Sequence, residues 1–111
     1  MKPMAEYIRM PGRNTELFTT RHPLRLLKKL QAFVATKPEE EEVKMVQDET
    51  TYKATITSPQ QNVELVAKVL KVKDGQFCLD FTRKKGELLD FMNLFKEIKD
   101  FVGPLTTTSI P

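Results

Sequence analysis

Two segments that flank the dipeptide Asp74-Gly75 constrain the fold most. Residues 63–72 and 77–81 are rich in β-branched and aromatic side chains, and apolar residues occupy alternate positions over much of their length. This period of two is typical of a β-strand with one buried face. Aspartate and glycine both tolerate the positive φ angles of a two-residue hairpin turn. The sequence therefore predicts an antiparallel sheet built around this hairpin.

Further strands are expected on the N-terminal side of the hairpin. Residues 43–46 and 52–57 have a similar composition, and residues 58–62 (SPQQN) form a looser turn before the next strand. A short strand is also expected at residues 17–19. Within the long strand, lysines take over the apolar phase after Val69, and this change predicts a β-bulge near Val69 and Leu70.

Two segments have the apolar period of amphipathic helices. The first covers residues 24–34, with Pro23 in its first turn and Pro38 beyond its end. The second covers residues 88–102 and ends at Gly103-Pro104. Its expected buried stripe consists of Leu88, Phe91, Met92, Phe95, Ile98 and Val102. Together these elements predict an α+β fold, a two-layer sandwich with two amphipathic helices on one face of a curved antiparallel sheet of four to five strands.

The chain length allows one such domain. Of the 111 residues, 1–14 are interpreted as a flexible leader, 15–103 as the domain and 104–111 as a flexible tail. There is no apolar run long enough to span a membrane and no secretory signal, so an intracellular protein is expected. The single cysteine excludes an internal disulfide, and one cysteine with one histidine leaves no cluster for a structural metal.

Residue patterns typical of catalysis are also missing from the sequence. Cys78 lies in the middle of an expected strand, on its less buried face and without a basic partner. His22 precedes the first helix, where a capping or surface role is expected. The sequence has four glycines and no phosphate-binding loop, paired carboxylates or serine elbow. We therefore expect no enzyme activity and no cofactor, and the acidic run at residues 39–42 is interpreted as a solvated loop.

Basic residues form three groups that are candidates for binding an anion or a protein partner. Residues 83–86 (Arg-Lys-Lys-Gly) are expected between the last strand and the second helix, where cations and free backbone N–H groups converge. The first helix carries Arg25, Lys28 and Lys29 on one stripe, together with Arg21 just before it. The third group is Lys68, Lys71 and Lys73. The alternative interpretation is that all three groups are only solvated charge, and without interleaved aromatic residues no specific nucleic acid is expected.

Two segments together resemble a known regulatory domain. Residues 80–91 (DFTRKKGELLDF), continued by Phe95, Ile98 and Lys99, resemble the C-terminal signature of the kinase-associated domain of Ser/Thr protein kinases, most closely that of the checkpoint effector kinases. Residues 15–19 (TELFT) are similar to the short motif that opens the domain in those kinases. The positions that match this pattern and are expected to form the scaffold are Phe18, Asp80, Phe81, Phe91, Phe95, Ile98 and Lys99.

The resemblance implies a function that the composition does not reveal. It implies a non-catalytic module that binds the kinase domain of the same polypeptide and inhibits it, in checkpoint signalling of the cell cycle after DNA damage. It also implies a nuclear and cytoplasmic location and, as an alternative, peripheral binding to acidic phospholipids through a basic surface. No kinase signature is present in the chain. A monomer is expected.

Overall fold

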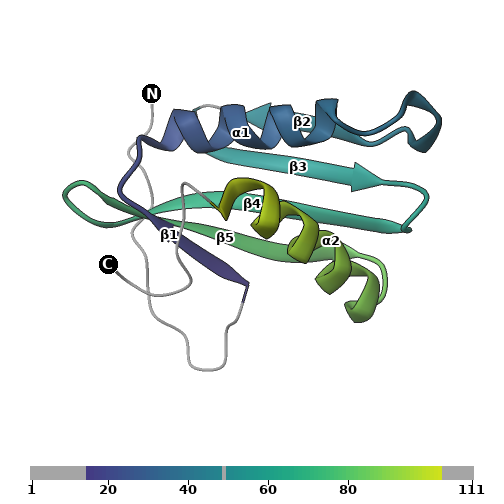
Figure 1. Cartoon of the computed structure of the whole chain (residues 1–111). Helices are drawn as coiled ribbons and strands as arrows, with labels where there is room; N and C mark the ends of the chain where they lie inside the picture. The colour runs from purple at the N-terminus through teal and green to yellow at the C-terminus, as the bar shows by residue number, and fades with distance from the viewer. Residues whose placement is uncertain (1–14, 49, 104–111) are drawn as a thin grey trace.

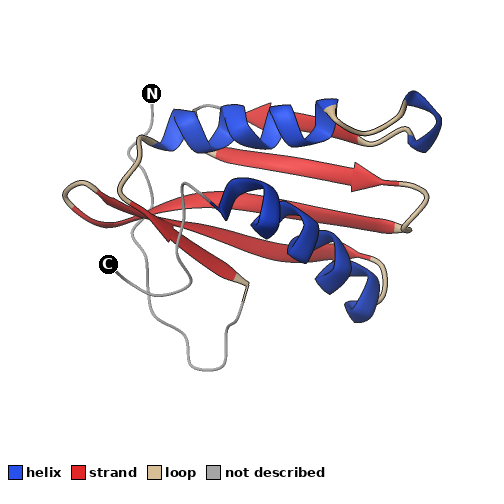
Figure 2. Ribbon diagram, viewed as in Figure 1, coloured by secondary structure: helices blue, strands red, loops and turns tan. Residues whose placement is uncertain are grey.

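The computed structural model describes residues 15–48 and 50–103. The expected flexible leader and tail lie outside these residues. Along the chain the elements are β1 (Glu16–Thr19), α1 (Pro23–Ala35), the 3-10 helix η1 (Glu39–Glu41), β2 (Lys44–Asp48), β3 (Lys53–Ser58), β4 (Val63–Lys73), β5 (Gln76–Lys85) and α2 (Leu88–Val102). Figure 1 shows their arrangement, and Figure 2 shows the helices in blue and the strands in red.

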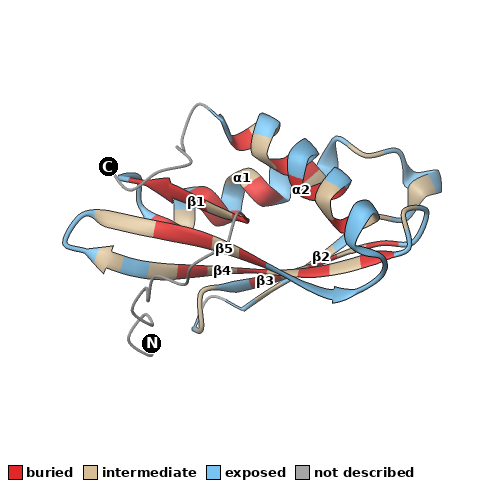
Figure 3. Ribbon diagram, turned by 90° about the horizontal axis from the view of Figure 1, so that it is seen from below, coloured by how far each residue is buried: buried red, intermediate tan, exposed pale blue. Residues whose placement is uncertain are grey.

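The five strands form one antiparallel sheet in the order β1-β5-β4-β3-β2. Both α-helices cover the same face of this sheet, with α1 over β2 and α2 over β4 and β5 (Figure 1). Seen along the sheet in Figure 3, the helices form one layer and the strands the other. The expected two-layer α+β sandwich is confirmed. We call the sheet face away from the helices the outer face.

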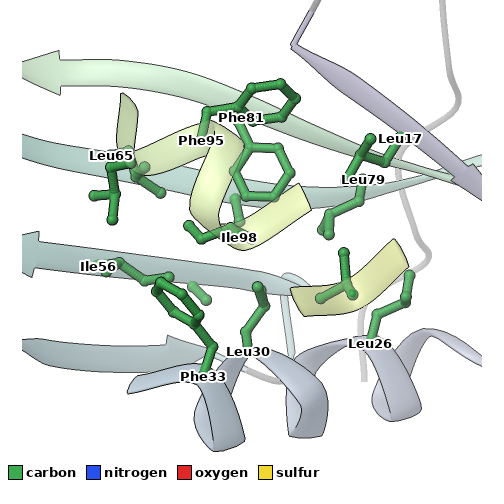
Figure 4. Close-up of a cluster of buried hydrophobic side chains, with 14 of the residues drawn as sticks. Leu17, Leu26, Leu30, Phe33, Ile56, Leu65, Leu79, Phe81, Phe95 and Ile98 are labelled. Carbon is green, nitrogen blue, oxygen red and sulfur yellow. The ribbon is translucent and has the colours of Figure 1, made fainter. Parts of the chain in front are cut away.

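The core lies between the two layers. Leu26, Leu30 and Phe33 of α1 point toward Ile56, Leu65 and Leu79 of the sheet, while Phe95 and Ile98 enter from α2 (Figure 4). Phe95 packs edge-on against Phe81 of β5, with 5.1 Å between the ring centroids. Burying such side chains supplies most of the favourable free energy of folding in a domain of this size. The apolar stripes predicted from the sequence therefore do meet in one core.

The hairpin forms as expected, but the predicted bulge is wrong. Gly75 has a φ of 75° in the two-residue turn between Lys73 and Gln76, which pair with each other. Val69 and Leu70 pair regularly with β5, whereas the register shifts lie between Glu64 and Leu65 and between Lys71 and Lys73. Lys71 and Lys73 continue the alternation of the buried residues Val63–Val69, and yet both are exposed. The hairpin extends beyond the helices, so this phase no longer faces a core.

The second helix differs from its predicted stripe at its N-terminal end. Leu88 is 58% exposed rather than buried, and Met92 is only half-buried. Leu94, which the prediction omitted, is fully buried. In the first turn of α2 it is Phe91 that packs into the core, whereas Leu88 and Leu89 face solvent.

The ends of α1 show how local sequence sets its limits. His22 caps the N-terminus, since its Nδ1 accepts a hydrogen bond from the backbone N–H of Leu24 at 3.1 Å, and the helix begins at Pro23 as expected. Beyond the helix, the acidic run forms the 3-10 turn η1, which is largely exposed as expected. The positive φ of Glu42, 53°, ends that turn.

A polar contact ties three segments together at the other end of α1. Lys37 Nζ lies 2.8 Å from Glu97 Oε1 of α2, and Gln61 Nε2 of the β3–β4 turn donates to Glu97 Oε2 at 3.0 Å. Partial burial raises the pKa of Glu97, but the bonds from Lys37 and Gln61 outweigh it and the net pKa is lowered. This carboxylate is therefore ionised at neutral pH and joins α1, α2 and the sheet.

Candidate docking site

The two segments that carry the family resemblance lie side by side. β1 pairs with β5, so that Leu17 is opposite Leu79 and Phe18 is opposite Cys78. Thr15 reinforces this pairing, because its backbone carbonyl accepts from the N–H of Phe81 at 3.0 Å and its hydroxyl donates to the carbonyl of Phe81 at 3.0 Å. Segments more than sixty residues apart in the sequence thus form one structural unit.

The predicted scaffold residues fall into two classes by burial. Phe81, Phe91, Phe95 and Ile98 belong to the core between the layers. Phe18 is also buried, at 4% exposure, but its pairing with Cys78 places it on the outer face. Asp80 and Lys99 are half-buried. Most of the signature therefore specifies packing, and the surface available to a partner must come from other positions.

The region between β5 and α2 forms a projecting corner, which we define as residues 83–89. Every residue in it is exposed. Arg83, Lys84 and Lys85 belong to β5, where Arg83 is opposite Leu65 and Lys85 is opposite Glu64. The expectation that these three cations lie between the last strand and the second helix is therefore wrong. The strand runs to Lys85, and their backbone groups belong to the sheet.

Two of the three cations in the corner already interact with neighbouring polar groups. Arg83 Nη1 donates to the carbonyl of Gly86 at 3.2 Å. Lys84 Nζ lies 4.0 Å from a carboxylate oxygen of Glu64, and that carboxylate also accepts from the Thr57 hydroxyl at 3.2 Å. Lys85 borders a shallow depression of about 200 Å³ against the β3–β4 turn. A carboxylate among these lysines makes the corner a poorer site for a free anion than the sequence predicted.

Gly86 has a structural role. Its φ is 103°, a conformation that side chains rarely adopt. A Cβ atom at this position would overlap the backbone carbonyl oxygen of Asn62 in the β3–β4 turn. The absence of a side chain lets the corner approach that turn closely and so fixes the direction in which α2 leaves the sheet.

Two leucines at the corner are the feature that sequence reasoning missed. Leu88 and Leu89 are 58% and 72% exposed, and Val46 is the other exposed large hydrophobic residue in the part of the chain that the structure describes. The available signal was their position directly after Gly86-Glu87, in a first helical turn that follows a strand end. Exposed leucines beside three cations form a surface that combines apolar area with positive charge.

The basic group on α1 lies apart from the corner. Arg25 and Lys28 are exposed, and Lys29 Nζ lies 4.9 Å from the centre of the Phe101 ring, near the C-terminus of α2. The corner instead lies at the N-terminus of α2, about 20 Å away along the helix axis at 1.5 Å per residue. The basic residues of α1 are therefore not near enough to the corner to support an anion site there.

The third basic group is also separate. Lys71 and Lys73 lie at the hairpin end of β4, where Lys71 Nζ is 3.0 Å from Asp74 Oδ1. The corner pairs with the opposite end of β4, at Glu64, and Figure 1 shows the two at opposite ends of the sheet. Lys68 lies opposite Asp80 on one side and Lys53 on the other. The three basic groups do not converge on one anion site.

Cys78 does not resemble a reactive thiol. It lies on the outer face, as predicted, but it is fully buried there. Its Sγ is 3.9 Å from a carboxylate oxygen of Glu16, and a neighbouring carboxylate disfavours the thiolate. Among residues 15–48 and 50–103, no group of three or more histidine, cysteine, aspartate or glutamate side chains is placed to hold a metal ion.

Two comparisons of the sequence, with protein families and with curated proteins, found no match. Within the described part of the chain, none of the helices is long and apolar enough to cross a membrane. The fold and the corner are thus the observations from which a function is inferred.

Proposed function

We propose that this chain is the regulatory module of a Ser/Thr protein kinase, which docks on the kinase domain of the same polypeptide and inhibits it. The observation that carries the proposal is the pairing of the two resembling segments as adjacent strands, β1 and β5. The two-helix, five-strand sandwich agrees with the fold of the kinase-associated domain, two helices packed on a curved antiparallel sheet. A checkpoint kinase is favoured because both segments resemble that group most closely.

The corner is the best-supported docking surface. Leu88 and Leu89 are exposed, although burying one leucine side chain is worth about 1.5–3 kcal/mol. Arg83, Lys84 and Lys85 precede them in the same exposed segment, and residues at interfaces commonly combine apolar anchors with arginine. Gly86 lies close against the β3–β4 turn, and a surface fixed by such a contact loses less conformational entropy on binding.

The proposal predicts that the 111-residue chain inhibits a separate checkpoint kinase domain in trans. Tethering supplies an effective concentration in the millimolar range, so micromolar amounts of the free chain are required. Leu89→Asp should weaken this inhibition by about tenfold or more, because it replaces an apolar anchor by a charge. Val46→Asp is the matched control, since Val46 is equally exposed, at 72%, but lies on the far edge strand. Kinase activity would be titrated against each variant.

Two results would contradict parts of this proposal. Flat kinase activity up to the solubility limit of the wild-type chain, with a full-length kinase that is restrained, would exclude direct docking by the module. Equal inhibition by Leu89→Asp and Val46→Asp would retain docking and exclude the corner as its surface. Thermal melting of both variants would verify that each is folded.

A second candidate function is peripheral binding to acidic phospholipids, and the same leucines favour it. Exposed apolar residues beside lysine and arginine are typical of surfaces that insert shallowly into a bilayer, where each cation near the membrane contributes about 1 kcal/mol. The positive charge around the corner is reduced by the acidic residues Glu64, Glu87 and Asp90. Insertion of the leucines therefore has to supply much of the free energy.

Vesicle binding tests this second candidate. The chain should bind phosphatidylserine vesicles more tightly than phosphatidylcholine vesicles, and higher salt should weaken the binding because surface charges are screened beyond about 8–10 Å. Arg83→Glu/Lys85→Glu should abolish the preference for acidic lipid, and Leu89→Asp should reduce the remaining binding. If neither change alters sedimentation with acidic vesicles, the corner is not a membrane contact.

A further inference from the structure

The open edge of the sheet at β2 is a feature that the proposed function does not use. β2 is the last strand in the sheet, so within the described residues only one of its sides is paired, with β3. Met45 and Gln47 face the helices, and Gln47 Oε1 accepts from Gln31 Nε2 of α1 at 2.8 Å. Lys44, Val46 and Asp48 are exposed on the outer face. An open edge with an exposed β-branched residue is a template for another strand.

The sequence of β2 (KMVQD) is complementary to itself in one arrangement. In an antiparallel pair centred on Val46, Lys44 of one copy is opposite Asp48 of the second copy, and Val46 is opposite Val46. All these pairs lie on the outer face, because residues two apart on a strand share a face. Opposite charges and apolar side chains meet in this register, whereas a parallel pair in the same register places like charges together.

The charges on the neighbouring strand are compatible with this arrangement. Asp48 is opposite Lys53 of its own β3, so in the pair it lies between two lysines. Hydrogen bonds from Thr50 keep the Asp48 carboxylate in place, with its Oδ1 accepting from the backbone N–H at 3.0 Å and from the hydroxyl at 2.7 Å. Pairing of β2 with β2 of the second copy would add inter-strand hydrogen bonds between the two copies.

We propose that two copies of this chain associate through antiparallel pairing of β2 about Val46, which joins their sheets into one. The contact is short, and interfaces of small area are weak and transient. We therefore expect a dimer with a dissociation constant on the order of 0.1 mM. This inference is independent of the proposed function, because β2 is separated from β5 and its corner by β3 and β4.

A charge-swap series tests the pairing. Sedimentation equilibrium of the 111-residue chain should show a monomer–dimer equilibrium. Lys44→Asp and Asp48→Lys should each weaken the dimer by about tenfold, because like charges then face each other at both ends. The double variant Lys44→Asp/Asp48→Lys restores opposite charges and should restore dimerisation. Lys73→Asp makes the same charge change at an exposed position on the β4–β5 hairpin and should have no effect.

Cysteine trapping tests the register itself. In the proposed pair the two Val46 Cα atoms are about 4.5–5.5 Å apart, within the range that a disulfide bridges. Val46→Cys in a Cys78→Ser background should form a covalent dimer on mild oxidation. Lys44→Cys in the same background should not, since the two substituted residues are four positions out of register, roughly 13 Å apart.

The outcomes separate the proposal from its alternatives. A wild-type chain that remains monomeric at every concentration up to its solubility limit, with equal trapping of the two cysteine variants, would overturn it. Dimerisation that the charge swaps do not alter would place the contact elsewhere on the molecule and also overturn it. Circular dichroism and thermal melting of each variant would identify any that fails to fold, and the double swap provides a folded comparison with the single ones.

Discussion

Gly86→Ala is expected to destabilise the folded chain by about 3 kcal/mol or more, through two additive causes. Alanine at a φ of 103° pays a steric penalty that glycine avoids, and its methyl group would overlap the carbonyl oxygen of Asn62. That oxygen belongs to backbone and cannot rotate away as a flexible side chain would. For a domain of this size the melting temperature should fall by about 15 °C, measured by calorimetry or circular dichroism.

Two other glycines provide matched controls for this prediction. Gly75 has a φ of 75° but no heavy atom within 4 Å of its Cβ position, so Gly75→Ala should cost only the conformational part, about 1 kcal/mol. Gly103 has a φ of −43° and the same open space, so Gly103→Ala should be nearly neutral. Equal destabilisation by Gly86→Ala and Gly75→Ala would show that the corner does not lie as close to the β3–β4 turn as the structure places it.

The elements that local sequence determines could be predicted, and those that depend on neighbouring elements could not. The apolar period of α1 and the turn at Asp74-Gly75 act within a few residues and were found with their approximate limits. The predicted position of the bulge is wrong because the pattern has two explanations. Lys71 and Lys73 are exposed although they continue the alternation of the buried residues before them. Either the register shifts, or the core ends before the strand does. In the structure both apply, because Lys71 is exposed in regular register where the core ends, and the register then shifts between Lys71 and Lys73.

The candidate site shows the same limit. The three basic groups are evident in the sequence, but whether they converge depends on which end of each strand and helix they occupy. Lys71 and Lys85 lie on adjacent strands, yet antiparallel pairing puts one at the hairpin and the other at the corner. The length of β5 also determines whether Lys84 lies beside a helix terminus or beside a carboxylate. The local sequence predicts neither the length of β5 nor the end of the sheet at which each basic group lies.

The burial of the signature residues bears on how mutations in them would be interpreted. Most of the positions that match the family pattern are core residues, whereas Leu88 and Leu89 at the corner are exposed. A variant of a buried position can lose inhibition simply by unfolding. A variant of an exposed leucine is expected to stay folded, so a loss of inhibition there indicates a lost contact with the partner. Comparing both kinds of variant therefore separates folding from docking, which a single loss-of-function mutation cannot do.

The sharpest comparison on α2 pairs Phe95→Ala with Leu89→Ala. Phe95 is 4% exposed and packs edge-on against Phe81, joining α2 to β5. Its truncation removes this contact and leaves a cavity, at a cost of about 3–5 kcal/mol. Such a loss approaches the whole stability of a small domain, which is typically about 5–15 kcal/mol. Urea denaturation should therefore show a much lower midpoint with little change in slope.

Leu89→Ala should change stability by no more than about 0.5 kcal/mol, because the side chain is mostly in solvent already. Both variants should lose inhibition of the kinase domain at a temperature near the melting point of Phe95→Ala. On cooling, Phe95→Ala should recover inhibition as its folded fraction recovers, whereas Leu89→Ala should remain defective. Recovery of neither variant would mean that Phe95 also contacts the partner, and recovery of both would mean that the exposed leucine does not.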